Sequence, residues 1–286
     1  MNTNKAKETI KELSISKLRP FKEHPYRVVD DEEMDRLVES IEEHGVMTPI
    51  NVRPIVGGYE VISGHRRIHA AKRAGLDTIP AIEMDMTRDQ AAVALVDSNL
   101  HREKLLPSEK AFAYKLKLEA LKNQGARTDL TSVQVGQKLS RAIVAESANE
   151  SNTQIQRYIR LTNLIPPLLR MVDEERIAFT PAVELSYLSQ EEQEMLFTEI
   201  GVTLATPSLS QACRLKKLSG EGKLDEDVIA EIMAEEKPNQ KERVSVPLSA
   251  LKGKVPDSYT DRQLQEYVIK AVDHYHRYLT RQREVR

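Results

Sequence analysis

Residues 59–75, YEVISGHRRIHAAKRAG, contain the feature that most restricts what this chain can fold into. An alternating apolar pattern, typical of a strand, runs into a Ser-Gly pair and then into the spacing of a helix. Gly64 stands at the corner between them and is followed at once by His65, Arg66 and Arg67. A glycine corner beside a helix N-terminus with two guanidinium groups could bind a phosphate, but these residues alone favour a solvated surface turn.

The segments around this corner predict a mixed α and β domain of about 100 residues. Residues 30–45 carry apolar side chains at i, i+3, i+4 and i+7 and end in a glycine, as a helix does. Strand patterns cover residues 47–55, 58–63 and 78–84. Thr87 and Gln90 have the spacing of a capping box, which begins another helix.

From Pro107 the periodicity becomes helical and stays so to about residue 218. The fold class expected is therefore α+β, with a small mixed domain followed by an all-α region. The predicted parts are a flexible tail at 1–11, the mixed domain at 12–105, the helical region at 106–218, a linker at 219–260 and a final helix at 261–286. The linker is inferred from its mixture of glycine, proline and charge.

Composition excludes several classes of protein. The formal net charge of −2 argues against a uniformly cationic coat for nucleic acid, although single segments are basic. The single cysteine, Cys213, excludes an intrachain disulfide and a multi-cysteine zinc site. No apolar run has the length of a membrane span or of a signal peptide core, so a cytoplasmic location is expected.

Residues 141–164 contain two short helical patterns with the spacing of a helix-turn-helix. Ala145 is the small residue of the first helix, Asn149 suits a left-handed turn, and Ile155 is the buried aliphatic of the second helix. Ser151 and Gln154 are expected to cap that second helix. The predicted DNA-binding residues are Ser151, Asn152, Thr153, Gln154, Gln156, Arg157 and Arg160. The alternative is a helical corner whose polar face is merely solvated.

A second polar cluster, SNLHRE, follows an apolar helix at residues 98–103. Its amide, imidazole and guanidinium groups fall within one turn, which is more than a solvated helix end requires. Asn99 could contact a nucleotide or a hydrated Mg²⁺ ion through its carbonyl oxygen. In the alternative reading, Asn99 only caps the helix and Arg102 only pairs with Glu103.

Together these motifs, in this order, resemble the ParB/RepB family of partition proteins over about residues 12–210. Gly64, Arg66 and Arg67 match the family motif G-E-R-R, and Asn99 and Arg102 match its motif E-N-x-x-R. The resemblance implies a ParB/sulfiredoxin-like N-terminal domain that binds CTP and Mg²⁺, and a dimer that recognises a parS-like palindrome in double-stranded DNA. It also implies a ParA-type ATPase as a partner and a location on a nucleoid or plasmid. The nucleotide-binding residues it implies are Gly64, His65, Arg66, Arg67, Asn99 and Arg102, with Asn99 as the metal ligand.

Two departures from the family leave open whether the nucleotide is hydrolysed. His65 stands where the family has the glutamate of the first motif, and Ser98 stands where it has the glutamate of the second. Asp97 lies one residue earlier, but one step along a helix turns a side chain by about 100°. The N-terminal tail has Lys5, Lys7 and Lys11 but no arginine before Arg19, so stimulation of a ParA-type ATPase also stays open.

The final helix carries Leu264, Val268, Ala271, Tyr275 and Tyr278 at alternating spacings of 4 and 3, the seam of a short coiled coil. Four arginines follow on its last turns, at positions 277, 281, 283 and 286. A seam this short could equally pack on the rest of the chain. The family resemblance favours a dimer.

The main prediction is therefore a partition protein gated by CTP. An alternative is a transcription or nucleoid-organising regulator without a ParA partner. A nucleotide-dependent enzyme is a further alternative, but sulfiredoxin chemistry needs a thiolate where this chain has Gly64, and a kinase would not explain the helix-turn-helix.

Overall fold

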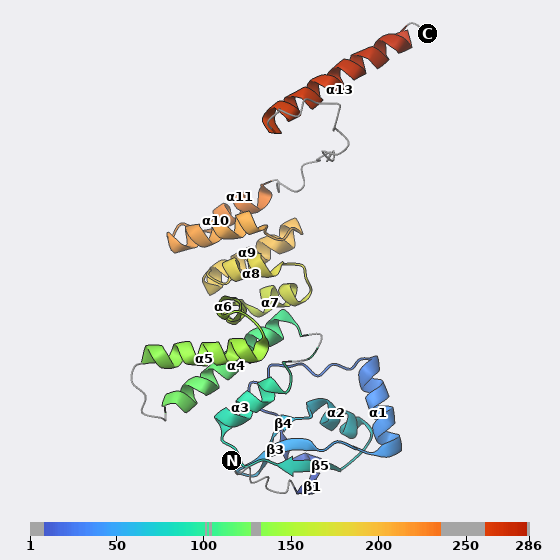
Figure 1. The fold of residues 1–286 in the computed structure, drawn as a ribbon, viewed down its shortest axis with the longest axis vertical. Helices are drawn as coiled ribbons and strands as arrows, with labels where there is room; N and C mark the ends of the chain where they lie inside the picture. The colour runs from blue at the N-terminus through green and yellow to red at the C-terminus, as the bar shows by residue number, and fades with distance from the viewer. Residues whose placement is uncertain (1–8, 101, 103–104, 127–132, 236–260, 285–286) are drawn as a thin grey trace. The chain divides into compact units, whose positions relative to one another are not determined.

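The computed structural model describes residues 9–100, 102, 105–126, 133–235 and 261–284 (Figure 1). The chain divides into two units, Met1–Glu235 and Glu236–Arg286. The first contains the sheet and all but the last of the helices below. None of the helices in the described ranges is long and apolar enough to cross a membrane.

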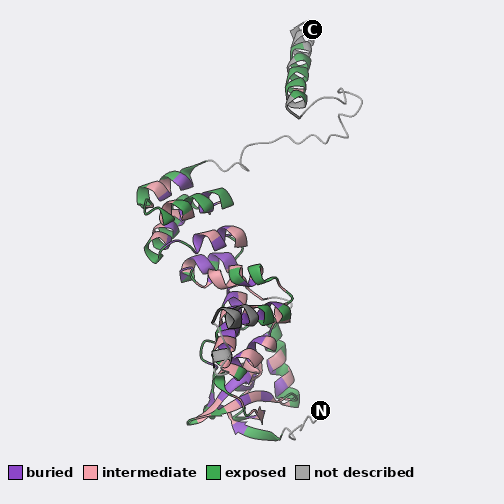
Figure 2. Ribbon diagram, turned by 60° about the vertical axis from the view of Figure 1, so that its left-hand side comes forward, coloured by how far each residue is buried: buried purple, intermediate pink, exposed green. Residues whose placement is uncertain are grey.

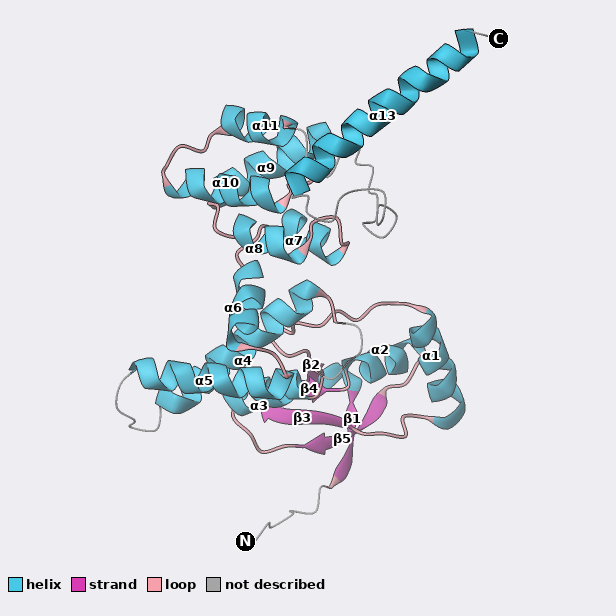
Figure 3. Cartoon of the chain, turned by 45° about the horizontal axis from the view of Figure 1, so that its top comes forward, coloured by secondary structure: helices cyan, strands magenta, loops and turns pink. Residues whose placement is uncertain are grey.

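A five-stranded mixed sheet forms the first part of the chain, shown in magenta in Figure 3. Its strands run in the order β1-β5-β3-β4-β2. Their bounds are β1 Ile10–Ser14, β2 Leu18–Arg19, β3 Ile50–Ile55, β4 Gly58–Ser63 and β5 Thr78–Glu83, with a 3-10 turn at Ile15–Lys17. β3 and β4 form the predicted antiparallel hairpin, and β5 joins β3 in parallel. The two outermost strands, β1 and β2, have no counterpart in the sequence-based prediction.

Two helices cover the sheet, α2 His65–Arg73 and α3 Arg88–Asp97, and a third, α1 Glu32–His44, packs on α2. The alternation of side chains along β4 assigns α2 and α3 to different faces. Val61 packs in the cluster that holds Ile68 and Ala71 of α2, whereas Ile62 packs with Leu95 of α3 and with α4. The β4–α2 corner therefore lies between two hydrophobic layers, which fix its position.

The helix boundaries confirm several of the sequence-based predictions. Asp31 caps α1, and Gly45 ends it in a left-handed conformation with φ of 69°. Thr87 and Gln90 form the predicted capping box at the start of α3. Pro107 is the first residue of the next helix, as predicted.

The helical region consists of α4 Pro107–Ala126, α5 Val133–Ala148, α6 Asn152–Leu161, α7 Pro166–Asp173, α8 Phe179–Leu185, α9 Gln190–Thr203, α10 Leu209–Gly220 and α11 Glu226–Ala234. Two cores hold it together. The smaller one joins α4, α5 and α6 around Tyr114, Val144 and Ile155. The larger one extends from Leu161 through α7 to α11.

The predicted linker at 219–260 begins too early. Residues 226–234 form α11, whose Ile229, Ile232 and Met233 are buried in the larger core. Asp225 caps this helix by accepting a hydrogen bond from the backbone of Val228. The apolar residues of this helix span only about one and a half turns. Such a short periodic pattern is not recognisable among the surrounding glycines and charged residues. Residues 236–260 lie outside the described residues.

The second unit contains α13, Asp261–Glu284. Those of its side chains that the structure describes are mostly exposed, as the green colour in Figure 2 shows. Cys213 is also exposed, on α10 of the first unit.

Candidate functional site

A pocket of about 230 Å³ lies at the corner between β4 and α2. Three segments that are distant in the sequence line it: the irregular segment before α1, the β4–α2 corner and the end of α3. Its lining residues are His24, Tyr26, Arg27, Val28, Ser63, Gly64, His65, Arg66, Arg67, Ser98, Asn99 and Arg102. The structure thus brings together all six residues predicted to bind nucleotide.

The backbone at Gly64 shows why the corner needs glycine. Its φ of 102° is a left-handed conformation that side chains disfavour. A Cβ atom there would lie 2.5 Å from Cγ2 of Ile50 and 3.3 Å from Cζ of Arg67. Gly64 therefore lets the N-terminus of α2, with its free N–H groups, face the pocket.

The two adjacent arginines have different surroundings. Arg67 donates hydrogen bonds of 2.5 Å to the carbonyls of Thr48 and Pro49, and burial lowers the pKa of its guanidinium. Arg66 forms ion pairs with Asp31 at 3.3 Å and Glu33 at 3.2 Å, at the start of α1. Arg67 is therefore held by the backbone, and an incoming anion competes with two exposed carboxylates for Arg66.

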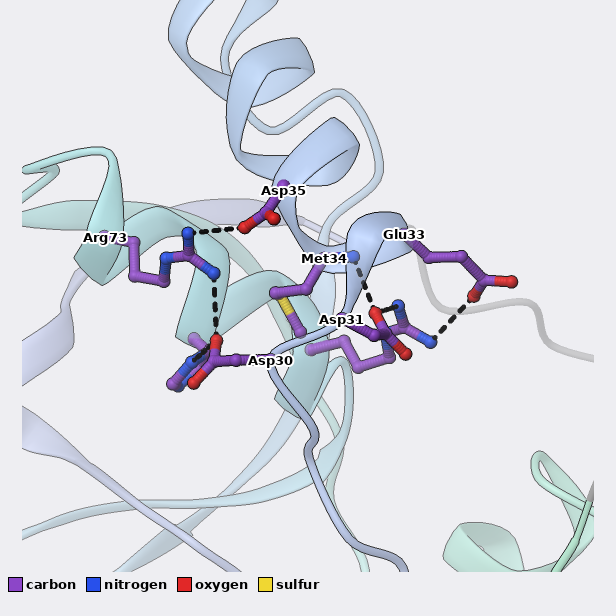
Figure 4. A network of polar contacts seen from close by, with 8 residues as sticks. Asp30, Asp31, Glu33, Met34, Asp35 and Arg73 are labelled. Carbon is purple, nitrogen blue, oxygen red and sulfur yellow. Dashed lines mark hydrogen bonds and ion pairs between the residues drawn. The ribbon is translucent and has the colours of Figure 1, made fainter.

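Further ion pairs hold α2 against the start of α1 (Figure 4). Arg73 contacts Asp30 at 2.9 Å and Asp35 at 2.7 Å, and His69 contacts Asp30 at 2.8 Å. Because these groups are largely exposed, water screens each pair, and its contribution to stability is small. Together these ion pairs orient the face of α2 that also carries Arg66.

His65 is the most unusual residue of the pocket. Its ring lies 3.8 Å from that of His24, centroid to centroid, and its Nε2 atom is buried without a hydrogen-bond partner among the described residues. Burial, followed by the charges of His24 and Arg102, lowers the pKa of His65 to about 3. Burial also lowers the pKa of His24, whose Nδ1–H donates to the carbonyl of Tyr26 at 2.7 Å. Both imidazoles are therefore neutral at pH 7.

The end of α3 supplies the opposite wall. The amide nitrogen of Asn99 donates to the carbonyl of Leu95 at 2.8 Å and to the hydroxyl of Ser98 at 3.1 Å. Arg102 lies over the ring of Tyr26, with its Cζ 5.6 Å from the centroid. None of the lining residues that the structure describes carries a carboxylate. The charged groups that line the pocket are guanidiniums, which are suited to binding a polyanion.

Sequence reasoning did not identify the wall formed by His24, Tyr26, Arg27 and Val28. The segment is irregular and lies about forty residues before the glycine corner, so no local periodicity connects the two. The buried carboxylate of Glu109 fixes it by accepting hydrogen bonds from the backbone of Arg27 and Leu106. Only the tertiary structure brings these contacts together.

The α5–α6 pair has the predicted helix-turn-helix geometry. Asn149 adopts the left-handed conformation with φ of 52°, and Ala145 and Ile155 are buried. The hydroxyl of Ser151 caps α6 by accepting a hydrogen bond from the backbone of Gln154 at 3.1 Å. Four of the predicted DNA-binding residues are exposed at the N-terminal half of α6: Ser151, Asn152, Thr153 and Gln156.

The remaining three predicted residues are partly buried. Arg157 donates to the hydroxyl of Thr180 at 2.8 Å and lies over the ring of Phe179. Arg160 donates to the carbonyl of Ser186 at 3.0 Å and lies 3.8 Å from the ring centroid of Tyr187. Both arginines thus connect α6 to α8 and its C-terminal end, and Gln154 accepts a weak hydrogen bond from Arg157.

Two other predictions fall only partly within the described residues. Lys5 and Lys7 of the tail lie outside them, whereas Lys11 is part of β1 and pairs with Glu83 at 2.7 Å. On α13, the side chains of Leu264 and Tyr278 are likewise outside. Val268 is half-buried, and Ala271 and Tyr275 are exposed. The side chain of Arg277 is exposed, those of Arg281 and Arg283 are not described, and Arg286 lies outside the described residues.

Comparison with known proteins places this arrangement in a family. Residues 1–100 match the ParB N-terminal domain. The chain is 34% identical over 169 residues to Stage 0 sporulation protein J of Bacillus subtilis, which covers 59% of this chain and 54% of that protein. It is 29% identical over 263 residues to the probable chromosome-partitioning protein ParB of Vibrio cholerae, covering 85% and 83% of the two chains. It is 31% identical over 199 residues to the nucleoid occlusion protein of Halalkalibacterium halodurans, covering 70% and 64%.

Among solved structures, a C-terminally truncated chromosome-partitioning protein ParB from Caulobacter crescentus, complexed with CTP-gamma-S, overlaps with a TM-score of 0.31 and 24% identity. It covers 67% of this chain and 98% of that one.

The fold and the sequence match together define a ParB N-terminal domain followed by an all-α region that contains a helix-turn-helix pair. Residues 1–100 match the ParB N-terminal domain family, and the chain is similar to chromosome-partitioning proteins over much of its length. It spans about half the length of the Bacillus relative.

Proposed function

We propose that this chain is a sequence-specific DNA-binding partition protein whose DNA binding is gated by CTP. The observation that carries the proposal is the convergence of both family motifs on one pocket. Gly64, Arg66 and Arg67 come from the β4–α2 corner, and Asn99 and Arg102 come from the end of α3. The relative from Vibrio, of which the chain covers 83%, bears the name of a chromosome-partitioning protein.

The pocket is suited to a triphosphate. The guanidiniums of Arg66, Arg67 and Arg102 provide charge-assisted donors, and the N-terminus of α2 adds backbone N–H groups. The preference for cytosine rests on the resemblance to the family. The neutral rings of His24 and His65 lie at 47° to each other, and either ring offers an aromatic surface on which a base could stack.

Magnesium would be held by Asn99 together with oxygens of the bound phosphates. The amide nitrogen of Asn99 is already used, which directs its carbonyl oxygen to other partners. A bound Mg²⁺ would neutralise phosphate charge. Hydrolysis is disfavoured in this proposal, because His65 has a pKa of about 3 and is a poor proton acceptor where a carboxylate would otherwise stand.

Calorimetric titration of the full chain with CTP, ATP and GTP in the presence of Mg²⁺ tests the nucleotide site. We expect CTP to bind selectively and Arg102→Ala to weaken it by about tenfold or more, equivalent to 1.4 kcal/mol. Lys223→Ala, a change at a largely exposed side chain of the helical region, is the matched control and should leave affinity unchanged. Absence of binding by every nucleotide would refute the site.

DNA recognition is assigned to the exposed N-terminal half of α6. Its hydroxyl and amide side chains can reach phosphates and base edges in a major groove. Arg157 and Arg160 would act on DNA only after leaving α8, or indirectly by holding α6 in place.

The recognition assignment is tested with a duplex that the wild-type chain selects from a random-sequence pool, measured against a scrambled duplex. Gln156→Ala should weaken binding to the selected duplex by about tenfold, since a two-pronged base contact contributes about 1–3 kcal/mol. Binding to the scrambled duplex should not change. Equal losses on both duplexes would show that Gln156 does not read bases.

A homodimer through α13 and a ParA-type ATPase as partner complete the proposal, with a location on a nucleoid or plasmid. The exposed seam of α13 supports the dimer. The ATPase contact rests on the family resemblance alone.

A second candidate is a regulator that organises the nucleoid without a ParA-type partner. The match to a nucleoid occlusion protein, 31% identical over 199 residues, favours it specifically. Both candidates share the pocket and the DNA-reading helix, so the discriminating measurement is ATP hydrolysis by the ParA-type protein of the same genome with and without this chain. Stimulation supports partition, and no effect supports the regulator.

A further inference from the structure

Lys117 lies near the middle of α4 with only 1% of its surface exposed. Its ammonium group contacts the carboxylate of Asp97 and donates a 2.6 Å hydrogen bond to the hydroxyl of Ser147. A buried ammonium group is tolerated only when its charge is compensated and its donors are used. Lys117 therefore depends on both partners, and the two partners are held together through it.

The two partners belong to the two halves of the proposed site. Asp97 is the last residue of α3 and directly precedes Ser98 and Asn99, which line the pocket. Ser147 lies at the end of α5, just before the left-handed turn at Asn149 that leads into α6. One side chain of α4 thus joins the end of the pocket wall to the start of the DNA-reading turn.

Two further polar links each join α4 to one side only: Asn123 donates to Asp89 of α3 at 3.1 Å, and Lys110 pairs with Glu150 of the turn at 3.3 Å. The apolar contacts between these elements are less specific. Leu100 packs against the cluster of α3 and α4 and also against the cluster of α4, α5 and α6. Such apolar packing is not directional and tolerates small displacements. The ion pair and hydrogen bond of Lys117 are directional, so they fix how the end of α3 and the end of α5 are placed along α4 (Figure 1).

We propose that Lys117 is a positioning residue that couples occupancy of the pocket to DNA binding by α5 and α6. A ligand that engages Ser98 and Asn99 moves the last turn of α3, and Asp97 moves with it because the three residues are consecutive. The ammonium group then follows Asp97 or stays with Ser147, and either outcome changes how α5 lies on α4. The inference rests on the proposed function of both sites.

The coupling is measured on the full chain as the ratio of two dissociation constants, one with DNA and one without. The dissociation constant of CTP-gamma-S is determined with and without a saturating amount of the duplex selected by the wild-type chain, in the presence of Mg²⁺. We expect DNA to change the wild-type constant by about fivefold or more, in either direction, since coupling between sites is reciprocal. In Lys117→Met, which keeps the length of the side chain and removes the charge, the ratio should be close to one. Each ligand alone should still bind.

Lys110→Met is the matched control. Lys110 also lies on α4 and pairs with Glu150 of the turn at 3.3 Å, but it has no partner on α3 among its described contacts. This variant removes a similar charge and one link to the helix-turn-helix, so a merely structural effect would appear here too. We expect it to keep the wild-type ratio. Asp97→Asn and Ser147→Ala test the link from its two ends with small changes, and each should move the ratio toward one even if Lys117→Met fails to fold.

The outcomes separate this inference from the function on which it rests. If the wild-type chain binds neither the nucleotide nor a specific duplex, the proposed function fails. If it binds both, the inference fails when the wild-type ratio is one, or when Lys117→Met, Asp97→Asn and Ser147→Ala all keep it. A ratio close to one in Lys110→Met as well would show that any disturbance of α4 removes the coupling. That result would overturn the role of Lys117.

Discussion

The corner at Gly64 has no room for a side chain, so the shape of the pocket depends on glycine at this position. The residue has a left-handed backbone, and a Cβ atom added to it would lie 2.5 Å from Cγ2 of Ile50. Its neighbours reinforce this arrangement, because Ile50 is fully buried and Arg67 is held by two carbonyls. Neither can withdraw easily from an added methyl group.

Gly64→Ala should therefore destabilise the chain more than Gly75→Ala does. Both glycines have positive φ, of 102° and 74°, but a Cβ at Gly75 meets no atom within 4 Å. Each substitution costs about 1–2 kcal/mol of backbone strain, and overpacking adds about 1–3 kcal/mol at Gly64 only. Urea unfolding of the two variants measures the difference. Equal losses would mean that Ile50 yields without cost.

His65 makes stability depend on pH. Its pKa is about 3 in the folded chain and about 6.5 when unfolded. Between these values the unfolded state binds a proton that the folded state does not, so stability rises with pH in this window. On acidification from pH 7 to pH 5 the chain should lose stability on the order of 1 kcal/mol per pH unit from this residue.

Urea unfolding of the wild type and His65→Gln at pH 7, 6 and 5 measures this effect. Glutamine does not titrate, so its curve should fall less steeply with decreasing pH. Part of the dependence should persist in the variant, because burial also lowers the pKa of His24. Parallel curves for the two proteins would argue that His65 takes up its proton equally well in the folded chain.

Among the elements, α6 is fixed by arginines that sequence reasoning assigned to DNA. The guanidinium of Arg160 lies on the ring of Tyr187 and donates to the carbonyl of Ser186. Lysine lacks the planar group that makes both contacts. Arg160→Lys should thus lower the free energy of unfolding by about 1 kcal/mol, measured by thermal or urea unfolding. Gln156→Ala on the exposed face of the same helix should change it by less than about 0.5 kcal/mol.

The elements that sequence predicts well are those whose signals are local. The cap at Ser151, the turn at Asn149 and the corner at Gly64 each depend on a residue whose conformational preference decides the outcome. The α11 helix and the edge strands β1 and β2 are not predicted from the sequence, because they are short and are stabilised by distant partners. One example is the pairing of β1 with β5. The same holds for the site, where two motifs predict six lining residues and neither predicts His24.

For the whole molecule, the seam of α13 predicts a dimer that one substitution should abolish. Val268 lies on the seam and is the half-buried one among its described residues. Val268→Asp places a carboxylate in the apolar contact of two helices, so the chain should sediment as a monomer at micromolar concentration.

Ile269→Asp is the control, because the next residue along a helix is turned away by about 100°. Ile269 is 64% exposed and off the seam, so this variant should stay dimeric. The reverse result would assign the contact to the neighbouring face of α13.

The lone thiol of Cys213 gives each chain one native attachment point for a reporter group. It is exposed on α10 and belongs neither to the residues that line the pocket nor to the exposed half of α6. A spin label can be attached there without first replacing other cysteines, since the chain has none. In a dimer the two labels form a single pair, so one distance distribution would report directly whether the helical regions approach one another when nucleotide or DNA is added.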